Sequence, residues 1–123
     1  MRYIMFLLIL LSGQVSAHQW TPTYPDLTPS YVDGIYKVTM TLYNARRDIQ
    51  WFEISVYDDD WNTVPFATID KVINVKHLTR KKIDIHIRGK DRNRVRYVCS
   101  RSKILTDALR GTVVNSRICS KIK

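Results

Sequence analysis

Apolar and polar residues alternate strictly in three segments of the chain. Residues 36–43 (YKVTMTLY), 50–57 (QWFEISVY) and 82–88 (KIDIHIR) each carry an apolar side chain at every second position. A period of two is typical of strands that bury one face and expose the other. Because only a short turn at residues 44–48 separates the first two strands, we expect them to form a hairpin.

Shorter segments extend this pattern. Residues 72–75 (VINV) are predicted to pair with the strand at 82–88, and residues 95–104 and 117–122 are predicted as the last two strands. The run DDDWN at residues 58–62 is rich in side chains that hydrogen-bond their own backbone, so we expect a turn there. Short strands separated by turns, without a long helical period, predict an all-β fold, a β-sandwich of about seven strands.

The chain divides into three parts. Residues 3–11 are almost wholly apolar, follow Arg2, and lead to small side chains at Val15 and Ala17. This arrangement predicts a signal peptide over residues 1–17, because a membrane span needs about 20 apolar residues. Residues 18–34 contain three prolines and are predicted as an extended arm or edge strand, and residues 35–123 as the sandwich. We therefore expect an exported protein that is periplasmic, secreted or associated with a surface or particle, with no transmembrane segment in the mature chain.

Export also decides the expected state of the two cysteines. Cys99 and Cys119 are the only pair in the chain, and cysteines of exported proteins usually form disulfides. We predict a disulfide that ties the last two strands together. Closing a loop of about 20 residues would stabilise the fold by about 3 kcal/mol.

The order of the strands resembles the N-terminal immunoglobulin-like domain of periplasmic pilus chaperones. The resemblance covers residues 35–98 and rests on a strand ending at Asn44, a second strand ending in the turn at residues 52–60, the step Val64-Pro65-Phe66, and the alternation of Ile83, Ile85 and Ile87 before Arg88. It implies an immunoglobulin-like β-sandwich. Members of that family clamp a pilin C-terminus between two such domains. With residues for one sandwich only, we expect this chain not to assemble pili.

A second resemblance is to immunoglobulin domains themselves. It rests on Trp51 in a predicted central strand and on Tyr97, which lies two residues before Cys99. The strand at residues 36–43 has no cysteine, so the inter-sheet disulfide of antibody domains cannot form.

Charge is distributed unevenly along the chain. The formal net charge is +9, but residues 18–75 contain 4 basic and 8 acidic residues, whereas residues 76–123 contain 15 basic and 3 acidic residues. We predict that the second part meets an anionic partner, such as a glycan, lipopolysaccharide or another polyanion. The charge split also predicts salt-sensitive self-association. The residues predicted to bind the anionic partner are Lys76, Arg80, Lys81, Lys82, Arg88, Lys90, Arg92, Arg94 and Arg96.

Two alternatives involve histidine. After cleavage behind Ala17, His18 would be the first residue, and its amine and imidazole could bind copper together with the D-x-H pair Asp84 and His86. A small nuclease could use His77 or His86 as general acid or base. No cofactor is predicted, and no motif for sequence-specific nucleic-acid binding accompanies the charge.

The sequence as a whole favours a binding or structural module over an enzyme. We expect it to act through protein–protein interaction, by addition of a strand at an exposed sheet edge, or through its basic second part on an anionic surface. Copper binding and nuclease activity are the alternatives.

Overall fold

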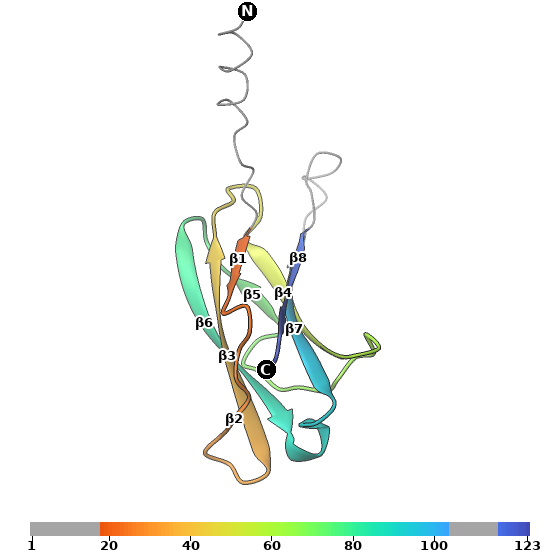
Figure 1. Ribbon diagram of the computed structural model, residues 1–123. Helices are drawn as coiled ribbons and strands as arrows, with labels where there is room; N and C mark the ends of the chain where they lie inside the picture. Colours follow the sequence, from red (N-terminus) through yellow and green to blue (C-terminus); the bar gives the residue numbers. More distant parts are fainter. Residues whose placement is uncertain (1–17, 104–115) are drawn as a thin grey trace, which may run out of the picture.

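The computed structural model describes residues 18–103 and 116–123, which form two sheets packed face to face (Figure 1). The predicted signal peptide, residues 1–17, lies outside the described residues. No helix in the described part has the length and hydrophobicity needed to cross a bilayer. The elements are β1 (His18–Thr21), β2 (Thr28–Pro29), β3 (Ile35–Asn44), β4 (Trp51–Asp58), β5 (Val72–Asn74), β6 (Thr79–Arg88), the 3-10 helix η1 (Gly89–Asp91), β7 (Val95–Lys103) and β8 (Arg117–Lys121).

The first sheet, sheet A, is centred on β3. Strand β6 pairs antiparallel with β3 over ten residues, from Ile35 opposite Arg88 to Asn44 opposite Thr79. On the other side of β3, β1 pairs with residues 41–44 and β2 pairs with residues 36–37. The proline-containing segment before β3 therefore adds two short strands to one edge of sheet A.

The second sheet, sheet B, has the strand order β5-β4-β7-β8. Two predicted pairings are wrong. Strands β3 and β4 form no hairpin, because the chain crosses from sheet A to sheet B between them, and β5 pairs with β4 in place of β6. Alternation of apolar and polar residues determines which face of a strand is buried, but not which strand lies beside it. The predicted and the observed strand pairings are therefore both compatible with the same alternation.

The core lies between the sheets and is formed by the apolar positions of the alternating strands. Leu42 and Ile85 from sheet A and Phe52 and Val98 from sheet B are among the side chains with no exposed surface. Among the described residues, the one tryptophan in the core is Trp20 on β1, which is 4% exposed, whereas Trp51 is only partly buried. The buried tryptophan that the immunoglobulin resemblance predicts at Trp51 is therefore found at Trp20, a residue of the arm.

Asn44 is a buried polar residue at the point where the chain leaves sheet A. Its side-chain amide donates hydrogen bonds to the carbonyl oxygens of Ile49 (2.7 Å) and Val75 (2.8 Å), and its side-chain oxygen accepts one from the Arg46 backbone N–H (2.9 Å). These bonds satisfy backbone groups of two connecting segments, the one between β3 and β4 and the one between β5 and β6. Asn44 thus fixes the connection between the two sheets.

Candidate functional site

Strand β8 lies at the edge of sheet B and is joined to β7 by the predicted disulfide. The Cα atoms of Cys99 and Cys119 are 4.1 Å apart and directly opposite each other in the register. This short spacing is typical of the antiparallel pair that exchanges no backbone hydrogen bonds. The N–H and C=O groups of Cys119, and those of Arg117 two residues earlier, therefore point away from β7.

Hydrogen bonds at the end of β8 show that successive backbone N–H groups point alternately toward β7 and away from it. The Ile122 N–H donates to the Arg96 carbonyl in the chain segment of β7 (2.8 Å), whereas the Lys121 N–H donates to the Thr23 carbonyl on the opposite side (3.1 Å). The Lys123 N–H likewise reaches the Pro25 carbonyl (3.1 Å). The arm thus covers the last part of the β8 edge. No partner for the outward backbone groups of Arg117 and Cys119 lies among the described residues.

Aromatic and cationic side chains hold β8 on its outer face. The guanidinium of Arg117 lies 5.7 Å from the Tyr57 ring and 5.4 Å from the Trp61 ring, and Trp61 stacks on Tyr97 with ring centroids 4.2 Å apart. Trp61 has φ +62°, a backbone conformation that bulky residues rarely adopt. Trp61 lies within the turn predicted at residues 58–62, in which the Asp58 carboxylate accepts hydrogen bonds from the N–H groups of Asp60 and Asn62 (both 2.9 Å).

His18 supports β8 from the inside of the sandwich. Its imidazole is buried beside the Phe52 ring and lies within hydrogen-bond distance of the hydroxyls of Ser100 (2.8 Å) and Ser116 (3.2 Å). Burial lowers the pKa of His18 to about 4, and the positive charge of Arg46 acts in the same direction. At neutral pH the ring is therefore uncharged and joins β1 to the start of β8.

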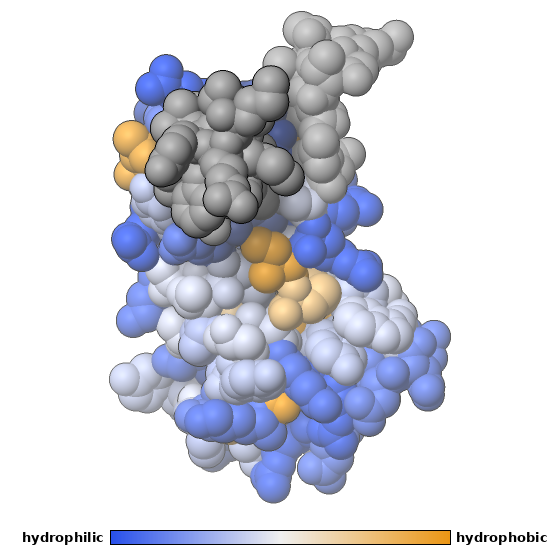
Figure 2. Space-filling view, turned by 45° about the horizontal axis from the view of Figure 1, so that its top comes forward, coloured by the Kyte–Doolittle hydropathy of each residue, from blue (hydrophilic) through white to orange (hydrophobic). Residues whose placement is uncertain are grey.

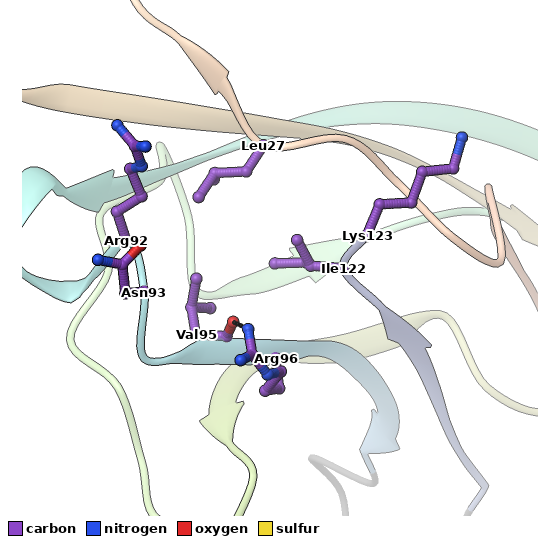
Figure 3. Close-up of a pocket in the computed structure, with 7 residues that line it drawn as sticks. All are labelled: Leu27, Arg92, Asn93, Val95, Arg96, Ile122 and Lys123. Carbon is purple, nitrogen blue, oxygen red and sulfur yellow. Dashed lines mark hydrogen bonds between the residues drawn. The ribbon is translucent and has the colours of Figure 1, made fainter.

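A hollow of about 460 Å³ opens where β8 ends (Figure 3). Leu27, Val95 and Ile122 point toward one another from three different segments and form its apolar part. The cations at its margin have partners within the chain. Arg92 donates to the Tyr36 hydroxyl (2.6 Å), Arg96 pairs with Asp59 (3.1 Å) and Lys123 lies 3.9 Å from Asp26.

The structure separates the basic residues that the sequence grouped. Arg80, Lys82 and Arg88 share the outward side of β6, while Lys90, Arg92, Arg94 and Arg96 lie at and beyond η1. Arg88 and Arg94 both bind Asp91, whose carboxyl is buried but has its pKa lowered by these two hydrogen-bonded guanidiniums. Lys76 precedes β6, and Lys81 lies beside a smaller hollow near Ile69.

Four of the eight acidic residues in residues 18–75 are paired with basic residues of the second part inside one molecule. Asp58 and Asp59 bind Arg94 and Arg96, and Glu53 binds both Arg101 (3.1 Å) and Lys103 (2.6 Å). Lysine and arginine at Glu53 lower the pKa of its carboxyl. Part of the opposite charge that predicted self-association is therefore paired within the molecule, where it stabilises the sandwich.

The structure does not bring together the residues of the copper alternative. His18 pairs with Asn44 at one end of β3 and points inward, whereas Asp84 and His86 lie on β6, across β3 and on the outer face. Five residues of strand, about 17 Å, also separate the positions opposite His18 and Asp84. The described residues contain no group of three or more histidine, cysteine, aspartate or glutamate side chains placed to hold a metal ion.

The two histidines of the nuclease alternative are also apart in the described structure. His77 lies between β5 and β6, and its buried Nδ1 has no hydrogen-bond partner among the described residues. His86 lies near the other end of β6, where its backbone N–H and C=O pair with Ala67 (2.8 and 2.9 Å).

Sequence reasoning missed several residues of this region. Lys37, Trp61 and Arg117 were not singled out, although each makes a specific contact with an aromatic ring. An exposed tryptophan inside an acidic turn was the one available signal for Trp61. For Lys37 and Arg117 there was none, because their neighbours come from distant strands.

Comparison with known proteins supports the fold. No protein-family model matches the chain, and no curated protein sequence matches it. Among solved structures, the E. coli chaperone DraB is similar, with a TM-score of 0.64 and 13% sequence identity over 86% of this chain. The match covers 53% of DraB, so the chain spans about half the length of that protein. The predicted resemblance to pilus chaperones is confirmed at the level of the fold.

Proposed function

We propose that this protein is a non-catalytic binding module that pairs with an extended segment of a partner protein at the free edge of β8. The outward backbone groups of Arg117 and Cys119 carry the proposal, since they offer donors and acceptors that no described residue uses. A strand added to such an edge gains affinity from main-chain hydrogen bonds. Similarity to a protein described as a chaperone supports a polypeptide as the partner.

The other sheet edges are less suited to strand addition. The edge of β6 carries Arg80, Lys81 and Lys82, and cationic side chains of this kind protect exposed edges from pairing. Ala67 already occupies part of the same edge opposite His86. The remaining edges are formed by shorter strands, since β5 has three residues, β1 has four and β2 has two. Among the described strands, β8 therefore has the edge best placed for a partner.

The β8 edge is also held rigidly before any partner arrives. The disulfide fixes its register with β7, and the guanidinium of Arg117 is held over Tyr57 and Trp61, beside the strand. Pre-organisation of this kind reduces the entropy lost on binding. The disulfide also supports a location outside the cytoplasm, in an oxidising compartment.

Backbone pairing fits the character of the visible surface. Figure 2 shows a face on which hydrophilic residues predominate and hydrophobic residues form only small, separate areas. A partner that docked by side-chain burial alone would need a larger apolar patch. Binding through main-chain hydrogen bonds at a strand edge does not require a large apolar patch.

Proline substitution tests the proposal. Arg117→Pro removes the outward N–H, while Arg117→Gln keeps it and removes only the guanidinium. Lys82→Pro is the matched control, because the Lys82 N–H points outward from the β6 edge, in the same direction as that of His86. Each tagged variant is expressed in the native host, and the partner recovered with the wild-type protein is quantified by mass spectrometry.

We expect Arg117→Pro to lower recovery of the partner about tenfold relative to Arg117→Gln, as the loss of one or two backbone hydrogen bonds would do. Lys82→Pro should leave recovery unchanged. Equal recovery with Arg117→Pro and Arg117→Gln, or a loss confined to Lys82→Pro, would refute binding at the β8 edge. Near-ultraviolet circular dichroism of each variant verifies that the sandwich is folded.

A further inference from the structure

The outer face of sheet A is a second, separate surface, formed by the outward residues of β3 and β6. Because Val38, Met40 and Leu42 on β3 are buried, the residues between them point to solvent, and the same holds for β6 around Ile83 and Ile85. The register sets these outward residues directly opposite each other: Tyr43 and Arg80, Thr41 and Lys82, Thr39 and Asp84, Lys37 and His86.

Three cations on this face have no carboxylate partner among the described residues. Arg80 lies over the Tyr43 ring at 4.7 Å, Lys37 lies 5.8 Å from the Tyr31 ring, and Lys82 is exposed. Two of the cations near η1 differ, because Arg88 and Arg94 are both bound to Asp91. Sheet A therefore carries three cations whose charge no described carboxylate offsets, and Lys37 joins Arg80 and Lys82 from the part of the sequence that is acidic overall.

The spacing of these cations fits an extended polymer. Arg80 and Lys82 are two residues apart on one strand, about 7 Å, and the row that holds Lys37 lies about 13 Å beyond Lys82. Asp84 lies between the two groups and accepts a hydrogen bond from the Thr39 hydroxyl (2.7 Å). It is the one carboxylate among the outward residues of β3 and β6, and it opposes the binding of an anion.

We infer that this face binds an anionic polysaccharide, with Lys37, Arg80 and Lys82 meeting its sulfate or phosphate groups. The threonines between the cations, together with exposed Gln19 and Thr21 on neighbouring β1, offer hydrogen bonds to sugar hydroxyls. A nucleic acid is less well matched, because single-stranded bases need aromatic faces for stacking. Among the outward residues of β3 and β6, Tyr43 is the one tyrosine, phenylalanine or tryptophan, and Arg80 lies over its ring.

A pair of single charge changes separates this site from a general effect of net charge. Asp84→Asn and Asp60→Asn each remove one negative charge from an exposed residue, the first on the sheet A face and the second in the turn after β4. Binding of the full chain to heparin is measured by its dissociation constant at fixed ionic strength. We expect Asp84→Asn to bind heparin about 2–5-fold more tightly than wild type, and Asp60→Asn to bind like wild type.

The reciprocal test removes the cations. Replacing Lys37, Arg80 and Lys82 together by Gln should weaken heparin binding about tenfold. The control replaces Arg96, Arg101 and Lys103 by Gln, which removes the same charge from residues that already hold ion pairs with Asp59 and Glu53. Its effect should be at most about twofold. Thermal melting of all variants shows that the fold is retained.

Three results would overturn the inference. If Asp84→Asn and Asp60→Asn tighten heparin binding equally, or if the two triple replacements weaken it equally, the effect depends only on the net charge of the protein. Tighter binding of a single-stranded DNA 20-mer than of heparin under the same conditions would exclude a polysaccharide as the preferred ligand. None of these variants changes an outward backbone group of β8, so the outcome is independent of the proposed strand addition.

Discussion

Acidification should destabilise the sandwich through His18 well before its carboxylates are protonated. The pKa of this buried imidazole is lowered from 6.5 to about 4 in the folded protein. Below pH 6.5 the unfolded chain therefore binds a proton that the folded chain does not, and the free energy of unfolding falls as the pH is lowered. The loss is about 2 kcal/mol at pH 5 and about 3 kcal/mol at pH 4, and it levels off below pH 4, where the folded protein also binds the proton.

This pH window can be separated from that of the carboxylates. Hydrogen bonds from Arg46 to Asp48 and from Lys103 to Glu53 lower the pKa values of these two carboxyls, so the stability that they contribute is lost only as the pH falls below their ordinary pKa values. The region between pH 6.5 and 5 therefore reports on histidine. Within it, His18→Gln is the matched variant, because an amide can still bond to the hydroxyls of Ser100 and Ser116 but does not titrate.

The assay is urea unfolding at pH 7, 6 and 5, followed by tryptophan fluorescence, since Trp20 is buried in the core. Linear extrapolation gives the free energy of unfolding at each pH. We expect the wild-type value to fall by about 2 kcal/mol more than that of His18→Gln between pH 7 and 5. Parallel pH profiles of the two proteins would refute the assignment of a buried neutral imidazole at this position.

Two further substitutions test the contacts that hold the sheets. Asn44→Ala should lower the free energy of unfolding by about 2–4 kcal/mol, because it leaves the carbonyls of Ile49 and Val75 without their donor; an effect below 1 kcal/mol in urea unfolding would contradict this role. Replacing Cys99 and Cys119 together by Ser should cost about 3 kcal/mol and speed amide exchange in β8. If amide exchange in β8, measured by mass spectrometry, is unchanged, the disulfide is not the main interaction that holds β8 on β7.

The positions of the strands were predictable because alternation is a local property of the sequence. Strands β3, β4, β6, β7 and β8 lie within a few residues of the predicted segments, and the disulfide joins the predicted pair. The pairing of the strands was not predictable in the same way. Whether β3 meets β4 or β6 depends on the path of the segment after Asn44, which bonds formed across the fold decide.

The candidate sites show the same limit. Arg92, Arg94 and Arg96 form a dense basic run in the sequence, yet Arg94 and Arg96 are bound to acidic residues from β4 and the turn after it. Lys37, by contrast, reaches the basic face of sheet A only because β3 pairs with β6. The free edge of β8 depends on where the arm ends its contact at Thr23 and Pro25. Each of these features arises from contacts between residues far apart in the chain.

The contacts of β1 bear on the order in which the protein can fold. The imidazole of His18 meets Ser100 and Ser116, and the Trp20 indole donates to the Val98 carbonyl (3.0 Å), across sequence separations of 82, 98 and 78 residues. Contacts of such range form slowly, because a long loop must close before they contribute. A nascent chain that has not yet reached β7 therefore lacks the partners that hold β1 in place. Closure of the sandwich must wait for synthesis of its last strands.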